Sequence, residues 1–152
     1  MKDSLFNPPT NKKATIRIAP VCNGKIYVVP KITPDKDKEC MDLPMEEHVE
    51  HWSPNSDKAI RKIKEKYHAH IHTSFTPRFS VQYKSQTNEG GIVYLYILPL
   101  KEENEIQFHN GKFVTEAEIA IHEQLFCKSL QKEREILGMA AELWQEFFLI
   151  QG

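Results

Sequence analysis

The sequence predicts an α/β layered fold with a mixed β-sheet, and three observations support this. β-rich runs alternate with segments of helical periodicity, which is typical of sheets layered with helices. An Asn-Gly pair at 23–24 joins the first two β-rich runs, and this dipeptide is a strong signal for an antiparallel hairpin. The run IVYLYILPL at 92–100 is apolar enough for a central strand. With 152 residues, 40% of them hydrophobic, the chain is long enough for one domain with a sizeable core.

The chain starts with this hairpin, whose strands are ATIRIAPV at 14–21 and KIYVVPKI at 25–32. The charged TPDKDKE that follows contains a proline and lacks periodicity, so it predicts an exposed loop. CMDLP at 40–44 predicts a short strand.

A helix is expected next. Ser53 is a favourable N-cap, and Pro54 fits the first turn because its missing N–H has no partner there. The helix should run to about Tyr67. Its apolar residues fall at helical spacing on one face, which should pack on the sheet: Ala59, Ile60, Ile63 and Tyr67.

Two β-rich runs follow, IHTSFTPRFSVQYKS at 71–85 and GGIVYLYILPLK at 90–101, separated by the turn-like QTNEGG. Their aromatic side chains lie at strand spacing: Phe75, Phe79, Tyr83, Tyr94 and Tyr96. Core and cross-strand packing is the main interpretation. Stacking of one or two of them on a base is the alternative.

The C-terminal part should be mainly helical. Asn110-Gly111 predicts another turn, and TEAE at 115–118 is a capping-box pattern. A long helix is expected from 122 to 149, with Gly138 as its weakest point. Its apolar stripe, which should pack on the domain or on a second copy, consists of Phe126, Leu130, Leu137, Ala141, Trp144 and Phe148.

Composition narrows the function classes. The net charge is −1, so duplex nucleic acid is not favoured as a partner. Cys22, Cys40 and Cys127 are an odd number at irregular spacing, which predicts buried thiols in a reducing compartment. No apolar run is long enough to span a bilayer. The chain is therefore expected to be cytoplasmic, with no membrane partner.

The order of elements and the stretch 41–71 resemble the Nudix hydrolases, whose box reads G-x5-E-x7-R-E-U-x-E-E-x-G-U, with U a bulky apolar residue. The resemblance covers residues 14–121, including DLP before the box, the box helix and GKFVTEAEI at 111–119. It implies an α/β/α sandwich with a mixed sheet over 14–121, preceded by a tail at 1–13 and followed by a C-terminal helical extension at 122–152.

The resemblance aligns Arg61 with the box arginine and Glu65 with its second glutamate. Lys62 and Lys66 then stand at the other two glutamate positions. Ser53 falls at the upstream glutamate, and Glu47 at the first glycine. In the family these glutamates bind Mg²⁺, a hard cation that needs oxygen ligands. Lysines there should repel Mg²⁺, so no cofactor is expected.

Two interpretations of the basic helix remain open. Lys58, Lys62 and Lys66 recur every four residues, and they are either a solvated face or a metal-free binding site for phosphate. Arg61 and Glu65 are the surviving catalytic positions and are spaced to pair with each other.

Two further groups of side chains could bind a metal ion. His68, His70 and His72 suit a transition metal if they share a strand face. The charged loop EEHVEH at 46–51 offers Glu46, Glu47 and Glu50, which with Glu65 could rebuild a Mg²⁺ site. Surface histidines and a solvated loop are the ordinary interpretations. No P-loop, G-x-G-x-x-G, H-E-x-x-H or G-x-S-x-G motif is present.

Three functions follow. The first is a Nudix-fold protein with a degenerate box that binds a nucleotide or other phosphorylated small molecule with little or no Mg²⁺-dependent hydrolysis. The second is an active pyrophosphohydrolase of nucleoside diphosphate-linked compounds that uses the rebuilt acidic site. The third is a structural module that forms a homodimer through the C-terminal helix.

Overall fold

The computed structural model of the chain describes residues 14–33, 38–50, 52–53, 57–73, 76–85 and 91–151. The strands are β1 (Ala14–Cys22), β2 (Lys25–Thr33), β3 (Lys38–Asp42), β4 (Met45–Val49), β5 (Arg78–Lys84), β6 (Ile92–Pro99) and β7 (Lys112–Val114). The α-helices are α2 (Asp57–Tyr67), α3 (Glu116–Ile121), α4 (Lys128–Glu142) and α5 (Trp144–Gln151). Two short 3₁₀ turns are η1 (Glu103–Glu105) and η2 (Glu123–Leu125).

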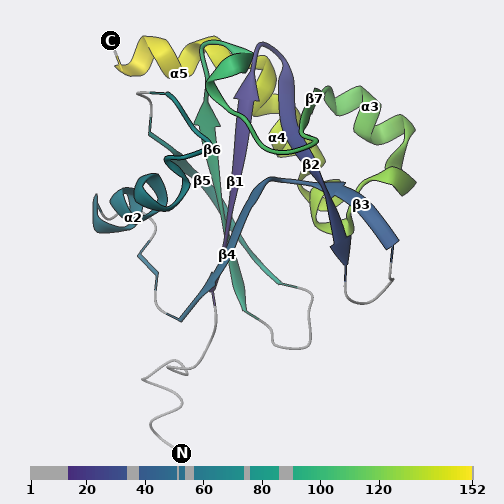
Figure 1. The fold of residues 1–152 in the computed structure, drawn as a ribbon, viewed down its shortest axis with the longest axis horizontal. Helices are drawn as coiled ribbons and strands as arrows, with labels where there is room; N and C mark the ends of the chain where they lie inside the picture. Colours follow the sequence, from purple (N-terminus) through teal and green to yellow (C-terminus); the bar gives the residue numbers. More distant parts are fainter. Residues whose placement is uncertain are drawn as a thin grey trace, which may run out of the picture.

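The strands form one mixed sheet in the order β3-β2-β1-β6-β5. β1 and β6 are parallel, whereas β5 and β6 are antiparallel. The edge of β1 opposite β6 pairs with two strands. Its first half pairs with β4, and only its end, Val21 and Cys22, pairs with β2. β2 then diverges toward β3 and β7 (Figure 1). The expected mixed sheet is confirmed.

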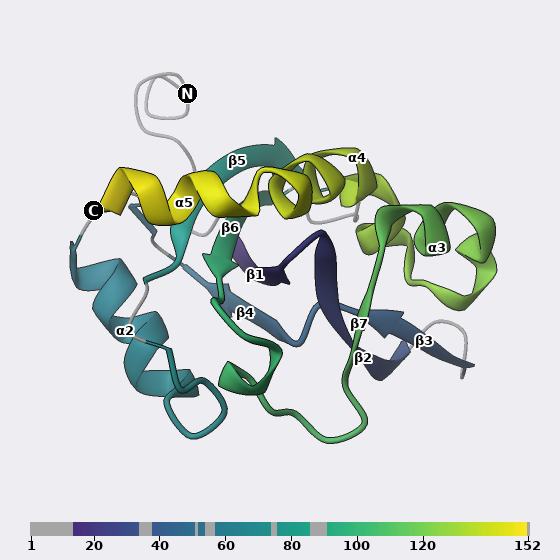
Figure 2. The ribbon, with the colours of Figure 1, turned by 90° about the horizontal axis from the view of Figure 1, so that it is seen from above.

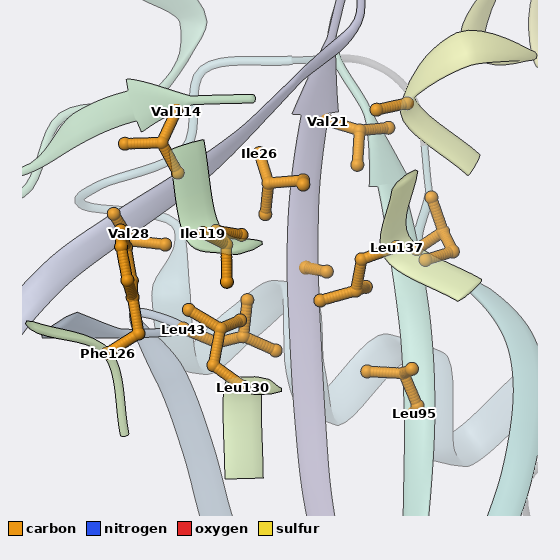
Figure 3. Packing of buried hydrophobic residues seen from close by; sticks show 13 residues of the cluster. Val21, Ile26, Val28, Leu43, Leu95, Val114, Ile119, Phe126, Leu130 and Leu137 are labelled. Atoms are coloured by element: carbon orange, nitrogen blue, oxygen red, sulfur yellow. The ribbon is translucent and has the colours of Figure 1, made fainter. Parts of the chain in front are cut away.

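Helices cover both faces of this sheet. Figure 2 shows α4 and α5 along one face and α2 against the other. On the α4 side, Leu130, Leu137 and Ala141 join a buried cluster with strand residues such as Val21 and Leu95 (Figure 3). On the α2 side, Ile63 packs into a second cluster with residues such as Ile16, Ile18 and Tyr96. The architecture is an α/β/α sandwich, and the C-terminal helices pack on it.

Several local predictions are confirmed because short-range chemistry determines them. Asn23 and Gly24 both have positive φ, at 47° and 81°, as the hairpin turn between β1 and β2 requires. Asn110 likewise has φ of 60° before β7. Thr115 and Glu118 form a reciprocal capping box at the start of α3. The helix α2 ends at Tyr67 as expected, while the proposed Pro54 start lies outside the described residues.

Other boundaries were wrong. EEHV at 46–49 is not a loop but most of β4, because it pairs with the first half of β1. Residues 68–70 form a turn rather than a strand start. The expected helix at 122–149 is divided into η2, α4 and α5, with the second break at Leu143. Gly138 is not the weak point, since a side chain there would collide with Glu116 of α3, so glycine permits this close helix packing.

The cysteine prediction was also wrong for two of three residues. Cys40 of β3 and Cys127, the residue before α4, form a disulfide with Cα atoms 5.2 Å apart. Cys22 alone is a buried free thiol, and burial raises its pKa to about 11. The pairing spans 87 residues of sequence, so it depends on how β3 and α4 meet in the fold and not on cysteine spacing. No helix in the described ranges is both long and apolar enough to cross a membrane.

Candidate functional site

The helix α2 carries the predicted basic residues on its outer surface. Its buried contact with the sheet is Ile63, which is 3% exposed, and Ile60 and Tyr67 pack beside it. Lys58, Lys62 and Lys66 are all exposed. Because they are spaced by one helical turn, they form a stripe along α2. The inward positions of Ile60, Ile63 and Tyr67 therefore agree with the sequence prediction, whereas the side chain of Ala59 lies outside what the structure describes. The lysines are available to solvent.

One lysine of this stripe has a carboxylate partner. Lys66 Nζ lies 2.9 Å from Glu47 Oε1 on β4. This hydrogen bond raises the pKa of Lys66. In the described ranges, no ion pair is found for Lys58 or Lys62. Lys66, which the resemblance to the Nudix box aligns with a glutamate, thus forms an ion pair with the neighbouring strand β4.

The surviving box residues do not pair with each other. Arg61 and Glu65 are both exposed, and no ion pair joins them although the structure describes both. The i,i+4 spacing permits contact on a helix but contributes only a few tenths of a kcal/mol at the surface. The expected orienting pair is therefore not formed.

The three histidines are not brought to one face. His68 Nδ1 lies 2.8 Å from the carbonyl oxygen of Glu65, so its ring caps the end of α2. The His70 ring stacks on Phe108, with centroids 4.2 Å apart, and its Nδ1 lies 3.1 Å from Gln107 O. In the part of the chain that the structure describes, no three His, Cys, Asp or Glu side chains are grouped closely enough to hold a metal ion.

The acidic residues at 46–47 serve two separate clusters. Adjacent residues of a strand point to opposite faces. Glu47 accordingly contacts Lys66 of α2, while Glu46 contacts Arg17 of β1 at 2.5 Å. Glu46 and Glu47 therefore do not converge on one point, and the rebuilt acidic site is not assembled from them. Glu50 is exposed beyond the end of β4, and His51 lies outside the described residues.

Arg17 lies at the centre of a buried ionic cluster that the sequence analysis missed. Its side chain is 1% exposed. Its Nε and Nη2 donate to Glu133 of α4 at 2.8 Å each, and its Nη1 and Nη2 donate to Asp42 of β3 at 3.2 and 2.7 Å. With the bond to Glu46, all five guanidinium N–H groups have a carboxylate acceptor. The available sequence signal was an arginine inside the apolar run ATIRIAPV.

This Arg17 cage, meaning Arg17 with Asp42, Glu46 and Glu133, contains three carboxylates and one guanidinium, a formal charge of 1 − 3 = −2. Burial acts to lower the pKa of Arg17, but Glu133 and Asp42 raise it well above its usual value. Tyr83 donates its hydroxyl to Glu133 at 2.7 Å, and burial together with the Glu133 charge raises the pKa of Tyr83. Arg17 thus stays charged in the interior, and Tyr83 supplies a further hydrogen bond to the cage.

The arrangement of these elements was compared with known proteins. Neither a protein-family profile nor a curated protein sequence matches the chain. Among solved structures, a NUDIX hydrolase from Nitrosomonas europaea aligns with TM-score 0.54 and 13% identity over 86% of this chain and 90% of that one. The Ap4A hydrolase of C. elegans aligns with TM-score 0.51 and 14% identity over 84% and 96%. The chain has a Nudix-like fold.

Similarity at this level does not extend to chemistry. A protein from Sinorhizobium meliloti described as a candidate oxidoreductase aligns equally well, with TM-score 0.55 and 14% identity. The alignment covers 91% of this chain and 43% of that one. A fold of this kind hosts different activities, so function must be argued from the site.

The Nudix-like fold implies Mg²⁺ at the box helix, and the residues present do not fit it. Mg²⁺ needs several oxygen ligands in octahedral geometry. Here the outer side of α2 offers Lys62 and Lys66, and the strand carboxylate Glu47 already pairs with Lys66. Glu65 is the one box carboxylate left on this helix. The chemistry of this donor set favours anions over divalent cations.

Proposed function

We propose that this Nudix-fold chain binds a nucleotide or another phosphorylated small molecule through α2, with little or no Mg²⁺-dependent hydrolysis. The observation that carries the proposal is the Lys66–Glu47 ion pair at a position where the resemblance implies a metal ligand. An ammonium group there compensates the strand carboxylate without a metal. Lys58 and Lys62 continue the same stripe and supply donors for phosphate oxygens.

The charge of α2 supports an anionic ligand. Its 11 residues include Lys58, Arg61, Lys62, Lys64 and Lys66, against Asp57 and Glu65, which gives 5 − 2 = +3. A phosphate near this face gains Coulomb energy from several cations at once. Lysine suits this role as a point charge that binds phosphate without fixed geometry.

A pyrophosphohydrolase with a rebuilt acidic site is the less favoured alternative. It requires Glu46, Glu47 and Glu65 to converge on one metal. Glu46 is hydrogen-bonded to Arg17 and Glu47 to Lys66, on opposite faces of β4. Such a site would need both ion pairs to break before the carboxylates could meet.

Calorimetry with a defined probe tests the proposal. Inorganic pyrophosphate and ADP should bind the purified chain equally well with Mg²⁺ and with a chelator. Lys58→Ala with Lys62→Ala should weaken this binding about tenfold, or about 1.4 kcal/mol. Lys84→Ala, an exposed lysine on β5, is the matched control and should leave it unchanged.

Charge reversal tests the loss of metal binding. Lys66→Glu with Lys62→Glu places new carboxylates beside Glu47 and should raise Mg²⁺ affinity, without needing to restore turnover. Mg²⁺- or Mn²⁺-dependent pyrophosphate hydrolysis by the unmodified chain, abolished by Glu65→Gln, would contradict the proposal. It would instead support the rebuilt site.

A further inference from the structure

The Cys40–Cys127 disulfide joins the two outer elements that enclose the Arg17 cage. Cys40 lies in β3, two residues before Asp42, and Cys127 directly precedes α4, six residues before Glu133. Asp42 and Glu133 each bind Arg17 through two oxygens. The covalent bond therefore lies beside the ionic one, and both connect β3 with α4.

Among the described residues, few other interactions hold β3 against α4. β3 is at the end of the sheet order, with β2 as its strand neighbour in the described sheet. The Cys127 amide donates to the Met41 carbonyl at 2.9 Å, and Met41 forms an isolated bridge with Phe126. Cage carboxylates from β3, β4 and α4 repel one another; the Arg17 guanidinium binds all three, and Lys31 of β2 is a second cation close to them. The position of β3 relative to α4 thus rests on the disulfide together with the Arg17 bridge and the Met41 contacts, whereas the pairing of β3 with β2 does not depend on the disulfide.

The three cysteines differ in solvent exposure. Cys40 is partly exposed, whereas Cys127 is 7% exposed. Cys22 is 2% exposed and lies in the cluster on the α2 side. Its raised pKa leaves little thiolate at neutral pH, and the thiolate is the reactive form. Cys40 is therefore the more exposed end of the disulfide, and Cys22 does not compete in exchange.

We propose that Cys40 and Cys127 form a reversible redox site: the oxidised pair fastens β3 to α4 around Arg17, and the reduced pair releases β3 from α4. The reductant is a small thiol such as glutathione. Its thiolate attacks Cys40 Sγ, the bond to Cys127 breaks, and Cys127 leaves as a thiolate that takes up a proton. A second glutathione resolves the mixed disulfide. Two electrons and two protons reach the protein, and two glutathione molecules become glutathione disulfide.

Reduction of the folded chain should have local and global effects. Amide hydrogen exchange should rise in 38–42 and 127–133, while α2 at 57–67 stays unchanged. The thermal midpoint should fall by roughly 10 °C, because a cross-link closing a loop of this size restricts the unfolded chain strongly. Glutathione disulfide should reverse both effects.

The experiment follows the full chain through a series of glutathione redox buffers without denaturant. Maleimide labelling with mass spectrometry counts accessible thiols, and hydrogen exchange locates the opening. Cys22→Ser is the matched control and should keep the full redox response. Cys40→Ser with Cys127→Ser should show the exchange pattern of the reduced protein in every buffer.

Two results would overturn the inference. One is a disulfide that glutathione reduces only after the chain is unfolded by denaturant, since that describes a permanent cross-link. The other is native reduction, detected by labelling, with unchanged exchange at both 38–42 and 127–133. Both readouts come from the unmodified protein, so they decide the matter even if the double variant does not fold. Neither readout involves a phosphate ligand, so the proposed function is tested separately.

Discussion

The basic face of α2 and the Arg17 cage both contain opposite charges, but their settings differ. On α2 the cations are exposed, and Lys66 pairs with Glu47 through side chains that are 49% and 35% exposed. In the cage the guanidinium is 1% exposed and every N–H group has an acceptor. Exposed charges are screened by water and remain available to ligands. Buried charges are stabilised mainly by one another, so removing one of them leaves the others without a compensating charge.

The largest expected effect is therefore in the cage. Arg17→Met should lower the free energy of unfolding by about 3–5 kcal/mol, because Asp42 and Glu133 lose their shared cation in the interior. Urea denaturation followed by circular dichroism measures it. Arg17→Lys, which keeps the charge but not the bidentate geometry, should lose less. A loss below about 1 kcal/mol for Arg17→Met would show that the cage is accessible to water.

A neutral buried contact provides an intermediate case. Trp144 packs against both core clusters, and its indole N–H donates to the Leu100 carbonyl. Trp144→Ala should cost about 3 kcal/mol, at the low end for a large aromatic residue because the ring is only partly buried. Trp144→Phe should lose about 1 kcal/mol, the contribution of one hydrogen bond. Thermal unfolding compares the two variants. Equal losses would mean that the ring itself contributes nothing.

Tyr83 sharpens the comparison within the cage. Tyr83→Phe removes one hydrogen bond to a charged acceptor and should cost about 1.5 kcal/mol at pH 7. The pKa of Tyr83 is raised in the folded state, so its contribution is complete below the unfolded value near 10 and is lost as pH rises above it. Stability measured from pH 7 to 11 should converge for the wild type and the variant. A constant difference across that range would contradict this.

The smallest effects are expected on α2. A double-mutant cycle with Lys66→Ala and Glu47→Gln should give a coupling of about 0.2–1 kcal/mol that falls in high salt. The pKa of Lys66 is raised in the folded state, so this coupling is complete at pH 7 and is lost as pH rises above about 10.4. Lys62→Ala removes a side chain with no ion pair among the described residues and should change stability by less than about 0.5 kcal/mol. A coupling above 2 kcal/mol would make the pair structural, like the cage.

The sequence predicts the short-range features of the fold but not its long-range contacts. The hairpin at Asn23-Gly24, the Thr115 capping box and the inward face of α2 follow from residues at most four apart, so sequence patterns identified them. The disulfide spans 87 residues, and Glu133 is 116 residues from Arg17. No local pattern encodes such contacts. The sequence of β4 resembled a charged loop because the cations that pair with its glutamates lie on other elements, β1 and α2.

The candidate site shows the same limit. The alignment of Lys62 and Lys66 with glutamate positions followed from sequence, but the partner of Lys66 did not. The i,i+4 spacing allows Arg61 and Glu65 to form an ion pair. At the surface, however, such a pair stabilises the helix too weakly to ensure that the contact forms. The histidines alternate in sequence, yet the turn at 68–70 separates their rings. The direction of a side chain depends on the backbone conformation, which the alternating histidines alone do not predict.

The placement of the two tryptophans gives each layer of the sandwich its own optical probe. Trp52 donates its indole N–H to the Tyr96 hydroxyl at 2.6 Å on the α2 side, while Trp144 joins the C-terminal helices to Leu100 just after β6. These are the only tryptophans in the sequence. Emission from Trp144→Phe therefore reports on the α2 side, and emission from Trp52→Phe reports on the docking of α5, whose Trp144 also contacts the cluster on the α2 side. Stopped-flow fluorescence of the two variants would measure the rate at which each helical layer packs on β6 during folding.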